Sequence, residues 1–425
     1  LLSNSSFAQN YKTKIKQTVD NLKKIGADFL FITASENNAW LLNIRGGDSD
    51  FSPLPNSYIL IQKNGKINFF CNTKKVSDSL KKKLLTVEFN DINLTGKVLS
   101  KIKNRKFVID HKTCSIFFES IIRKNNFIIK LNDPVYNFKA IKSKKEIKNI
   151  QKAHIFDGVA LTKYIFWLKK NFLKRRITEI SGEQKLLSFR KQNKFFKFLS
   201  FPTISGSGPN GAIIHYKATK KTNRRLKKGD IYLVDSGGQY LYGTTDVTRT
   251  VSLNNSNERI KNIFTRVLKG HIAVSNTKLK KNITGAILDS RARKYLRQIN
   301  LDYAHGTGHG VGYFLNVHEG PHSISKSNLS FFKEGMIVSN EPGYYEKDCF
   351  GIRIENLIYV KKKKLKNLFE NLTLVPLDKE LIDKSILNEN EIYWINKYHK
   401  RVFNSLKKYM NKVEFLELQK SCSAI

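Results

Sequence analysis

Short apolar runs alternate with amphipathic stretches over the first third of the chain. Ile15, Val19 and Leu22 recur at helical spacing, and the apolar run DFLFIT (28–33) follows them. Helical and strand patterns that alternate in this way are typical of α/β domains. The pattern therefore predicts an α/β domain over residues 1–136. Its further strands are expected at SYILIQ (57–62), KINFFCN (66–72), TVEFN (86–90), KFVIDH (106–111) and NFIIKLN (126–132).

The hydrophobic pattern changes near residue 137, where a second domain, 137–425, is predicted. Asp133-Pro134 interrupts the chain, and Ser143 with Glu146 forms an S-x-x-E capping box before a long amphipathic segment. The pattern is helical to about residue 195. It then predicts β hairpins with acidic residues to about residue 250, a helix over 258–274, a histidine-rich segment, a second acidic hairpin and a C-terminal extension.

The histidine-rich segment HGTGHGVGYFLNVHEG (305–320) places His305, His309 and His318 close together. Four glycines at alternate positions, from 306 to 312, make a helix unfavourable there. We therefore expect an extended or turning segment, with the three imidazoles lining a concave surface.

Two acidic hairpins flank this segment. In IYLVDSGGQYLYGTTDVTRTVSL (231–253), a hairpin that turns at Tyr240 and Leu241 would place Asp235 opposite Asp246 on one sheet face. In VSNEPGYYEKDCFGIRIENLIYV (338–360), Glu341 and Glu355 lie at equal distances from residue 348. Each hairpin is thus expected to bring two carboxylates together.

Opposed carboxylates on a buried sheet face repel each other, so the pairs require a cation or a shared proton. A proton-sharing dyad of the aspartic protease kind would leave the histidines without a role. Two Asp, two Glu and one neutral His carry four negative charges, which two divalent cations would cancel. Oxygen-rich ligation with one nitrogen favours Mn²⁺, with Co²⁺, Fe²⁺ or Zn²⁺ as substitutes.

The composition restricts the remaining function classes. The net charge of +41 is spread over the whole chain, and the basic run TKKTNRRLKK (219–228) lacks interleaved aromatic residues, so nucleic-acid binding is disfavoured. The start of the chain has too short an apolar stretch for a secretory signal, and no run is long enough to span a membrane. Four scattered cysteines without CxxC spacing indicate free thiols. We expect a cytoplasmic protein.

Six stretches resemble the Xaa-Pro aminopeptidases (aminopeptidase P, long cytosolic type) of the pita-bread metallopeptidase superfamily. They are NNAWLLNIRG (37–46), ISGSGPNGAIIHY (204–216), DSGGQYLYGTTDVTRT (235–250), HGTGHGVGYFLNVHEG (305–320), NEPGYYEKDCFGIRIEN (340–356) and NLTLVPLDKELID (371–383). The resemblance implies a creatinase N-terminal-like, ribonuclease-H-like α/β domain followed by an α+β pita-bread catalytic domain. Long family members carry one more α/β domain ahead of these two, and the chain, which begins at Leu1, resembles a truncated or shorter form.

The resemblance also implies residue roles. Asp235, Asp246, His309, Glu341 and Glu355 resemble the family's five metal ligands, and His215, His305 and His318 resemble its substrate-binding and catalytic histidines. The implied activity removes the first residue from peptides with proline second. A hydroxide that bridges the two metals would attack the Xaa-Pro carbonyl, with Glu341 as the proton acceptor. Family likeness also suggests a homodimer.

Three alternatives compete with this interpretation. A prolidase would cleave only Xaa-Pro dipeptides. A creatinase-like enzyme uses this fold without metal and is disfavoured because every ligand position is filled. A non-catalytic pita-bread relative that binds protein or nucleic acid would suit the basic charge, but it has no need to keep five costly polar groups together.

Overall fold

The computed structural model describes residues 9–254, 257–280, 282–363 and 366–425, and the chain divides into two compact units, 1–146 and 147–425. Residues 1–8, where the absence of a secretory signal is expected, lie outside the described residues. Residues 137–146 belong to the first of these units, whereas the sequence pattern assigns them to the second domain. The boundary at residue 136 stays a prediction.

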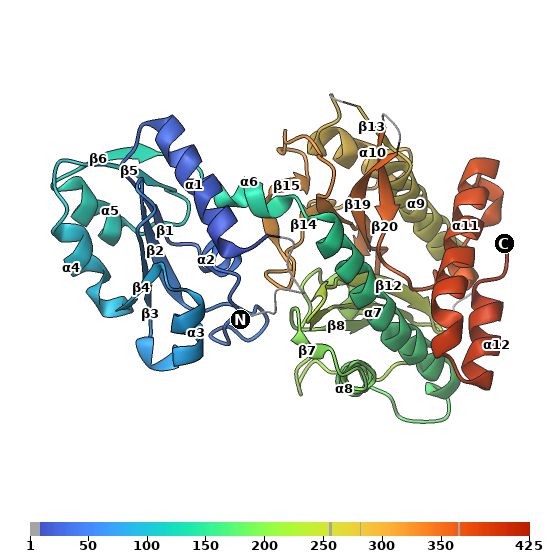
Figure 1. Ribbon diagram of the computed structural model, residues 1–425. Coiled ribbons are helices and arrows are strands. Elements are labelled where there is room, and N and C mark those ends of the chain that lie inside the picture. Colours follow the sequence, from blue (N-terminus) through green and yellow to red (C-terminus); the bar gives the residue numbers. More distant parts are fainter. Residues whose placement is uncertain (1–8, 255–256, 281, 364–365) are drawn as a thin grey trace. The chain divides into compact units, whose positions relative to one another are not determined.

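The first unit is built on one six-stranded sheet in the order β4-β3-β2-β1-β5-β6 (Figure 1). Pairs β1–β5, β5–β6 and β3–β4 are parallel, and β1–β2 and β2–β3 are antiparallel. The bounds are α1 (Tyr11–Ile25), β1 (Phe29–Ile32), α2 (Ser35–Leu41), β2 (Ser57–Gln62), β3 (Ile67–Cys71), α3 (Asp78–Lys83), β4 (Val87–Asp91), α4 (Thr95–Ser100), β5 (Lys106–Ile109), α5 (Ile116–Arg123), β6 (Phe127–Lys130) and α6 (Val135–Ala140).

The α/β pattern predicted for this region is confirmed. Every apolar run singled out in the sequence contains one strand of the sheet. Five of the six runs bury side chains, among them Ile59 and Phe70, whereas the run that forms β6 is only partly covered. The amphipathic segment with Ile15, Val19 and Leu22 is α1, and these three side chains are buried.

The second unit combines long helices with antiparallel sheets. Its bounds are α7 (Lys144–Asn171), α8 (Glu179–Lys191), β7 (Phe196–Leu199), β8 (Ile204–Ser207), β9 (Ile231–Ser236), β10 (Gly238–Tyr240), β11 (Gly243–Thr244), β12 (Val247–Ser252), α9 (Glu258–Ser275), β13 (Lys278–Leu279), α10 (Gly285–Arg297), β14 (Gly308–Gly310), β15 (Glu319–Ile324), β16 (Ile337–Asn340), β17 (Gly343–Glu346), β18 (Phe350–Arg353), β19 (Asn356–Lys363), β20 (Lys366–Asn371), α11 (Glu389–Leu406) and α12 (Lys412–Ser421). Sheets β12-β9-β8, β11-β10-β7, β13-β20-β19-β16-β14-β15 and β17-β18 make up its β structure.

The capping box expected ahead of α7 is present. The Glu146 backbone N–H donates to Ser143 Oγ at 3.2 Å, and the Ser143 backbone N–H donates to Glu146 Oε2 at 2.8 Å. The helix expected over 258–274 is α9, which ends one residue later. The glycine-rich histidine segment contains the short strand β14 and no helix, as predicted.

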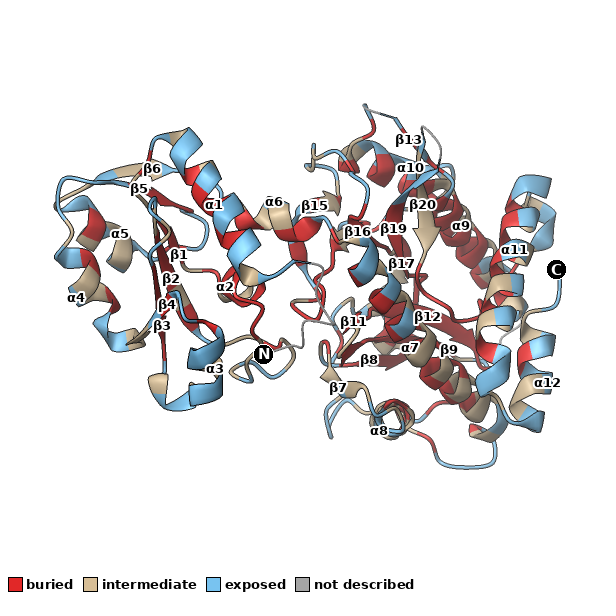
Figure 2. Ribbon diagram, viewed as in Figure 1, coloured by how far each residue is buried: buried red, intermediate tan, exposed pale blue. Residues whose placement is uncertain are grey.

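The core of the second unit lies between its helices and the concave sheets. Strands β9, β12 and β16 are buried along their whole length (Figure 2). Val267, Leu268 and Leu296 from α9 and α10 pack with residues of β18 in one hydrophobic cluster. Because the strands are held rigidly by this core, polar side chains at their ends have fixed positions. All four cysteines are free, as expected. Of the helices that the structure describes, none has the length and apolarity needed to span a bilayer.

Candidate metal centre

The first acidic hairpin has a different register from the one predicted. Asp235 pairs with Thr248, and Tyr240 pairs with Gly243, so the turn falls at Leu241 and Tyr242 rather than at Tyr240 and Leu241. Gly243 has φ +146°, and a Cβ there would lie 2.8 Å from Ile150 Cγ1, so only glycine fits at this end of the turn. The prediction that Asp235 and Asp246 oppose each other is therefore wrong by two residues.

The second acidic hairpin has the predicted register. Gly343 pairs with Arg353 and Glu346 with Phe350, while Asn340 pairs with Asn356. Both ladders are centred on residue 348, and Glu341 and Glu355 lie opposite each other where one ladder ends and the other begins. The symmetry noted in the sequence is confirmed.

The backbone at this junction joins three separate segments. The Glu341 N–H donates to the Thr307 carbonyl at 2.8 Å, and the Glu355 N–H donates to the Thr248 carbonyl at 3.2 Å. The two glutamates are thereby attached to the histidine segment and to the first hairpin. Segments more than a hundred residues apart in sequence thus meet at one point.

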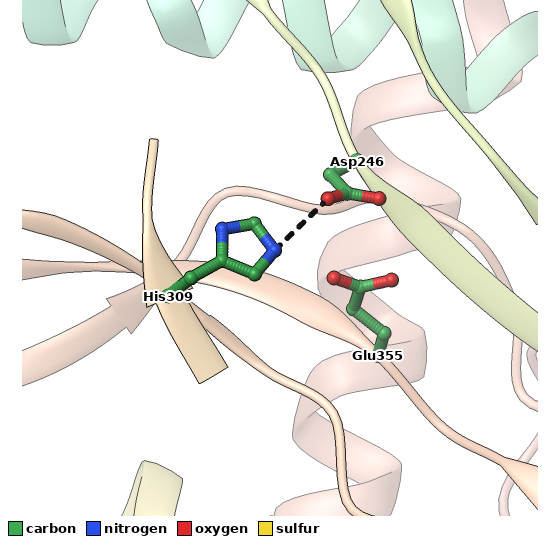
Figure 3. Close-up of side chains that lie close together, drawn as sticks. All are labelled: Asp246, His309 and Glu355. Carbon is green, nitrogen blue, oxygen red and sulfur yellow. Dashed lines mark ion pairs between the residues drawn. The ribbon is translucent and has the colours of Figure 1, made fainter. Parts of the chain in front are cut away.

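The side chains gathered there form a compact cluster. One donor atom each from Asp246, His309 and Glu355 lies within 4.8 Å of the others, and Figure 3 shows these three side chains pointing toward one another. His309 Nε2 is 3.4 Å from Asp246 Oδ2 and 3.4 Å from Glu341 Oε1. Asp235 lines the same cleft. The structure therefore brings together all five residues expected to bind metal.

Burial of the carboxylates makes their negative charges costly. The pKa of Asp246 is raised well above its ordinary value, by burial first and then by the charges of Asp235 and Glu341. Burial, followed by the charge of Asp246, likewise raises the pKa of Glu355. Burial also raises the pKa of Glu341. The arrangement favours a bound proton or cation over free carboxylates.

Two of the carboxylate oxygens have no hydrogen-bond partner within the described residues, although they are buried. They are Asp235 Oδ1 and Glu355 Oε1. His309 Nδ1 lies 3.0 Å from the Gly310 carbonyl, and donation to this oxygen leaves Nε2 unprotonated and directed at the carboxylates. Unsatisfied anionic oxygens beside a free imidazole nitrogen fit divalent cations, because a cation satisfies all of them together.

Three polar residues that the sequence analysis missed hold the carboxylates in place. Thr248 Oγ1 donates to Glu355 Oε2 at 2.8 Å, and Ser339 Oγ donates to Glu341 Oε1 at 2.8 Å. Arg353 Nη2 donates to Asp235 Oδ2 at 2.7 Å. Thr248, Ser339 and Arg353 each lie two residues from Asp246, Glu341 and Glu355, respectively. Thr248 and Arg353 support carboxylates of other segments, Glu355 and Asp235, so the spacing alone does not identify their partners.

A cleft of about 540 Å³ opens onto the cluster. His305, His309 and His318 all line it, so the concave surface expected for the three imidazoles of the histidine-rich segment is confirmed, and His215 lines it as well. The ring nitrogens of His215 and His318 make no hydrogen bond to any described residue, and His318 stacks edge-on against His309 at 4.1 Å between ring centroids. Both imidazoles are therefore available to a bound molecule.

His305 is held differently from the other two cleft histidines. Its Nδ1 lies 2.7 Å from the Gly306 carbonyl, and its Nε2 lies 2.8 Å from the Tyr345 hydroxyl. Tyr345 in turn accepts a hydrogen bond from Arg353 Nη1 at 2.6 Å. Burial lowers the pKa of His305 to about 4, so its ring is neutral at pH 7. Tyr345 thus connects His305 to the arginine that contacts Asp235.

Comparison with protein families finds three models in sequence order. The Creatinase/Prolidase N-terminal domain matches residues 1–146, Metallopeptidase family M24 matches residues 148–362, and the C-terminal region of peptidase M24 matches residues 368–425. Together they account for nearly the whole chain. The predicted order of an N-terminal creatinase-like domain and a catalytic domain with a C-terminal extension is confirmed.

Individual relatives agree with these models. The chain is 40% identical over 417 residues to a probable Xaa-Pro aminopeptidase P of Laccaria bicolor, and 40% identical over 405 residues to Xaa-Pro aminopeptidase 1 of Dictyostelium discoideum. These matches cover 94% and 92% of the chain but 64% of each relative, so the chain spans about two thirds of their length.

A solved structure matches the fold over the full chain. It is the X-prolyl aminopeptidase of Caenorhabditis elegans, described as a cytosolic enzyme with a di-nuclear active site. The TM-score is 0.95 at 31% identity, with 100% of this chain and 72% of that chain covered. The pita-bread fold expected for the second domain is confirmed.

Proposed function

The chain belongs to metallopeptidase family M24, and from this premise we propose that it is a di-metal aminopeptidase that hydrolyses the Xaa-Pro bond at the N-terminus of peptides. One observation carries the proposal. Asp246, Glu341 and Glu355 gather around His309 Nε2, and Asp235 lines the same cleft. Two buried oxygens of these carboxylates lack any partner in the described chain. Such a cluster stabilises bound cations and has little value without them.

The five residues of the cluster would hold two divalent ions, with Mn²⁺ favoured by the oxygen-rich donor set. When bound, the ions supply Lewis-acid polarisation of the scissile carbonyl and activation of a water molecule. The worm enzyme with a di-nuclear active site supports the number of ions. We also propose that the two bound ions are Mn²⁺.

Glu341 is the residue to which we assign proton transfer. Its Oε1 accepts from Ser339 Oγ, whereas its Oε2 has no hydrogen-bond partner among the described residues. Oε2 would take a proton from the attacking water as the oxygen bonds to the carbonyl carbon. The same proton would pass to the proline nitrogen as the C–N bond breaks, so that both products leave neutralised.

The cleft histidines divide the remaining work. His318 and His215 have unengaged ring nitrogens and would donate hydrogen bonds to the scissile carbonyl oxygen or to neighbouring peptide groups. His305, engaged with Tyr345, would contact substrate only if that hydrogen bond is exchanged. We assign His305 the role of orienting the peptide after this exchange.

The similarity to proteins described as Xaa-Pro or X-prolyl aminopeptidases supports selectivity for proline in the second position. A cytoplasmic location follows the description of the worm enzyme as cytosolic. We also propose that the chain forms a homodimer. Sedimentation velocity of the purified chain would measure its oligomeric state.

The test compares two tripeptides that differ only in the second residue, Phe-Pro-Ala and Phe-Ala-Ala. The metal-stripped chain is reloaded with Mn²⁺, and free phenylalanine is measured by chromatography. We expect release from Phe-Pro-Ala alone. Asp246→Asn should abolish it, because the substitution removes one anionic ligand from the cluster.

Asp348→Asn is the matched control. Asp348 is exposed at the tip of the second hairpin with φ +59°, a conformation that asparagine adopts readily. The activity of this variant should therefore equal that of the unaltered chain. Equal cleavage of the two tripeptides, or none of either, would reject the proposal. Preferential cleavage of the dipeptide Phe-Pro would instead identify a prolidase.

A further inference from the structure

One lysine, Lys217, lines the cleft beside the metal cluster. The only other lysine or arginine among the described residues of the cleft lining is Arg353. Arg353 is buried, and its guanidinium is bonded to Asp235, Tyr345 and Thr248. Lys217 is exposed, so its ammonium is the one cationic group of the lining that a ligand can reach.

The ammonium of Lys217 has no ion pair with any residue that the structure describes. Burial raises the pKa of Glu183, a half-buried carboxylate on α8, and the charge of Lys217 offsets part of this rise. No salt bridge joins the two side chains. Lys217 therefore stands at the cleft as a positive charge without a fixed counter-ion.

The chain that follows Lys217 is strongly basic. Residues 217–228 carry seven basic side chains and no acidic one, namely Lys217, Lys220, Lys221, Arg224, Arg225, Lys227 and Lys228. The first acid after them, Asp230, lies 3.8 Å from Arg224. Charges of one sign beside a cleft raise the local concentration of oppositely charged ligands.

Apolar side chains share the cleft lining with Lys217. Phe201, Pro202 and Ile214 line the same cavity. The lysine is thus placed to contribute both attraction and selectivity.

We propose that Lys217 recognises a carboxylate of the peptide substrate, supplied either by an acidic side chain or by the C-terminal carboxylate of a short peptide. This inference rests on the proposed function, since it concerns the same cleft. It assigns the enzyme a preference for acidic or very short peptides over neutral, longer ones.

The expected size of the effect follows from the exposure of the lysine. Partly exposed charge pairs typically change binding by about three- to tenfold. The same preference should weaken as salt rises, because exposed charges are screened beyond about 10 Å at 0.1 M ionic strength.

The experiment measures kcat/KM for matched peptides on the Mn²⁺-loaded chain. One arm compares Glu with Gln in amidated Phe-Pro-Glu and Phe-Pro-Gln, and in amidated Glu-Pro-Ala and Gln-Pro-Ala. A second arm compares Phe-Pro-Ala with its C-terminal amide. We expect at least one acidic member to be preferred about three- to tenfold, and the arm that shows it identifies the source of the carboxylate.

Variants then link the preference to one side chain. Lys217→Met should reduce the acidic-to-neutral ratio to about one, and Lys217→Glu should invert it. Lys220→Met, an exposed lysine of the same segment outside the cleft lining, should keep the ratio of the unaltered chain.

Two failures are distinguishable. If Phe-Pro-Ala and its amide are both left intact, the proposed function fails. If they are cleaved but no acidic peptide is preferred, or if Lys217→Met keeps the preference, the assignment to Lys217 is overturned while the peptidase activity stands.

Discussion

Replacing Thr248 by valine should weaken metal binding without disturbing the shape of the site. Thr248 is fully buried on β12, and its hydroxyl donates to Glu355 Oε2 at 2.8 Å and accepts from Arg353 Nε at 3.2 Å. Valine has nearly the same volume, so the main change is the loss of the donor to a buried carboxylate. Hydrogen bonds to charged groups contribute about 1.5–3 kcal/mol.

That energy range corresponds to a loss of roughly 10- to 100-fold in metal affinity, which is also typical of residues that orient metal ligands. Isothermal titration of Mn²⁺ into the metal-free chain measures it directly. Because the other ligands are retained, saturating Mn²⁺ should restore most of the activity. The substitution should therefore lower metal affinity and leave kcat of the metal-saturated enzyme nearly unchanged.

Thr250→Val provides the control on the same strand. Thr250 is equally buried, and its hydroxyl exchanges hydrogen bonds of 3.0 Å with the Arg353 backbone, without contact to a carboxylate. It should lower the free energy of unfolding by about 1 kcal/mol and leave metal affinity near that of the unaltered chain. Equal losses of affinity in both variants, or an unchanged affinity in Thr248→Val, would refute the claim that Thr248 orients a metal ligand.

Three further outcomes are expected. Chelation of the metal should lower the melting temperature, and Mn²⁺ at 100 times its Kd should restore about 2.7 kcal/mol per site by calorimetry; an unchanged melting temperature would contradict the cation role of the carboxylates. Tyr345→Phe should lower kcat/KM about tenfold at unchanged metal content, because it removes the hydroxyl between His305 and Arg353. Steady-state kinetics combined with metal analysis measures this effect, and full activity of the variant would contradict it. Burial raises the pKa of Asp133 from 3.8 to about 6, so the folded chain binds this proton more tightly than the unfolded chain. The stability that this group contributes is therefore fully present below about pH 4 and is lost as the pH rises through about 6. Urea unfolding between pH 4 and 7 should show a fall of roughly 3 kcal/mol, and Asp133→Asn should flatten it; equal slopes would contradict the assignment.

Local patterns were sufficient to predict most elements of the chain. The capping box at Ser143 and Glu146 was readable because both partners lie within one helical turn. The second acidic hairpin was readable because its symmetry about Asp348 coincides with a tight turn at φ +59°. In both cases the deciding interactions are short in sequence.

The register of the first hairpin could not be obtained from the hairpin alone. The turn position depends on the approach of Ile150, in α7, to Gly243, which is a contact between distant segments. The same limit applies to Arg353 and Tyr345, whose roles follow from hydrogen bonds to Asp235 and His305 in other segments of the chain. Residue types indicated the cluster, and long-range packing determined which polar groups support it.

We propose that the clustered carboxylates hold two cations. Anomalous diffraction from crystals of the Mn²⁺-loaded chain, recorded at the manganese edge, tests this claim most directly. We expect two peaks within the cluster formed by Asp235, Asp246, His309, Glu341 and Glu355, and their loss in Asp246→Asn. Density without peaks at this cluster, or peaks confined to other parts of the surface, would contradict it.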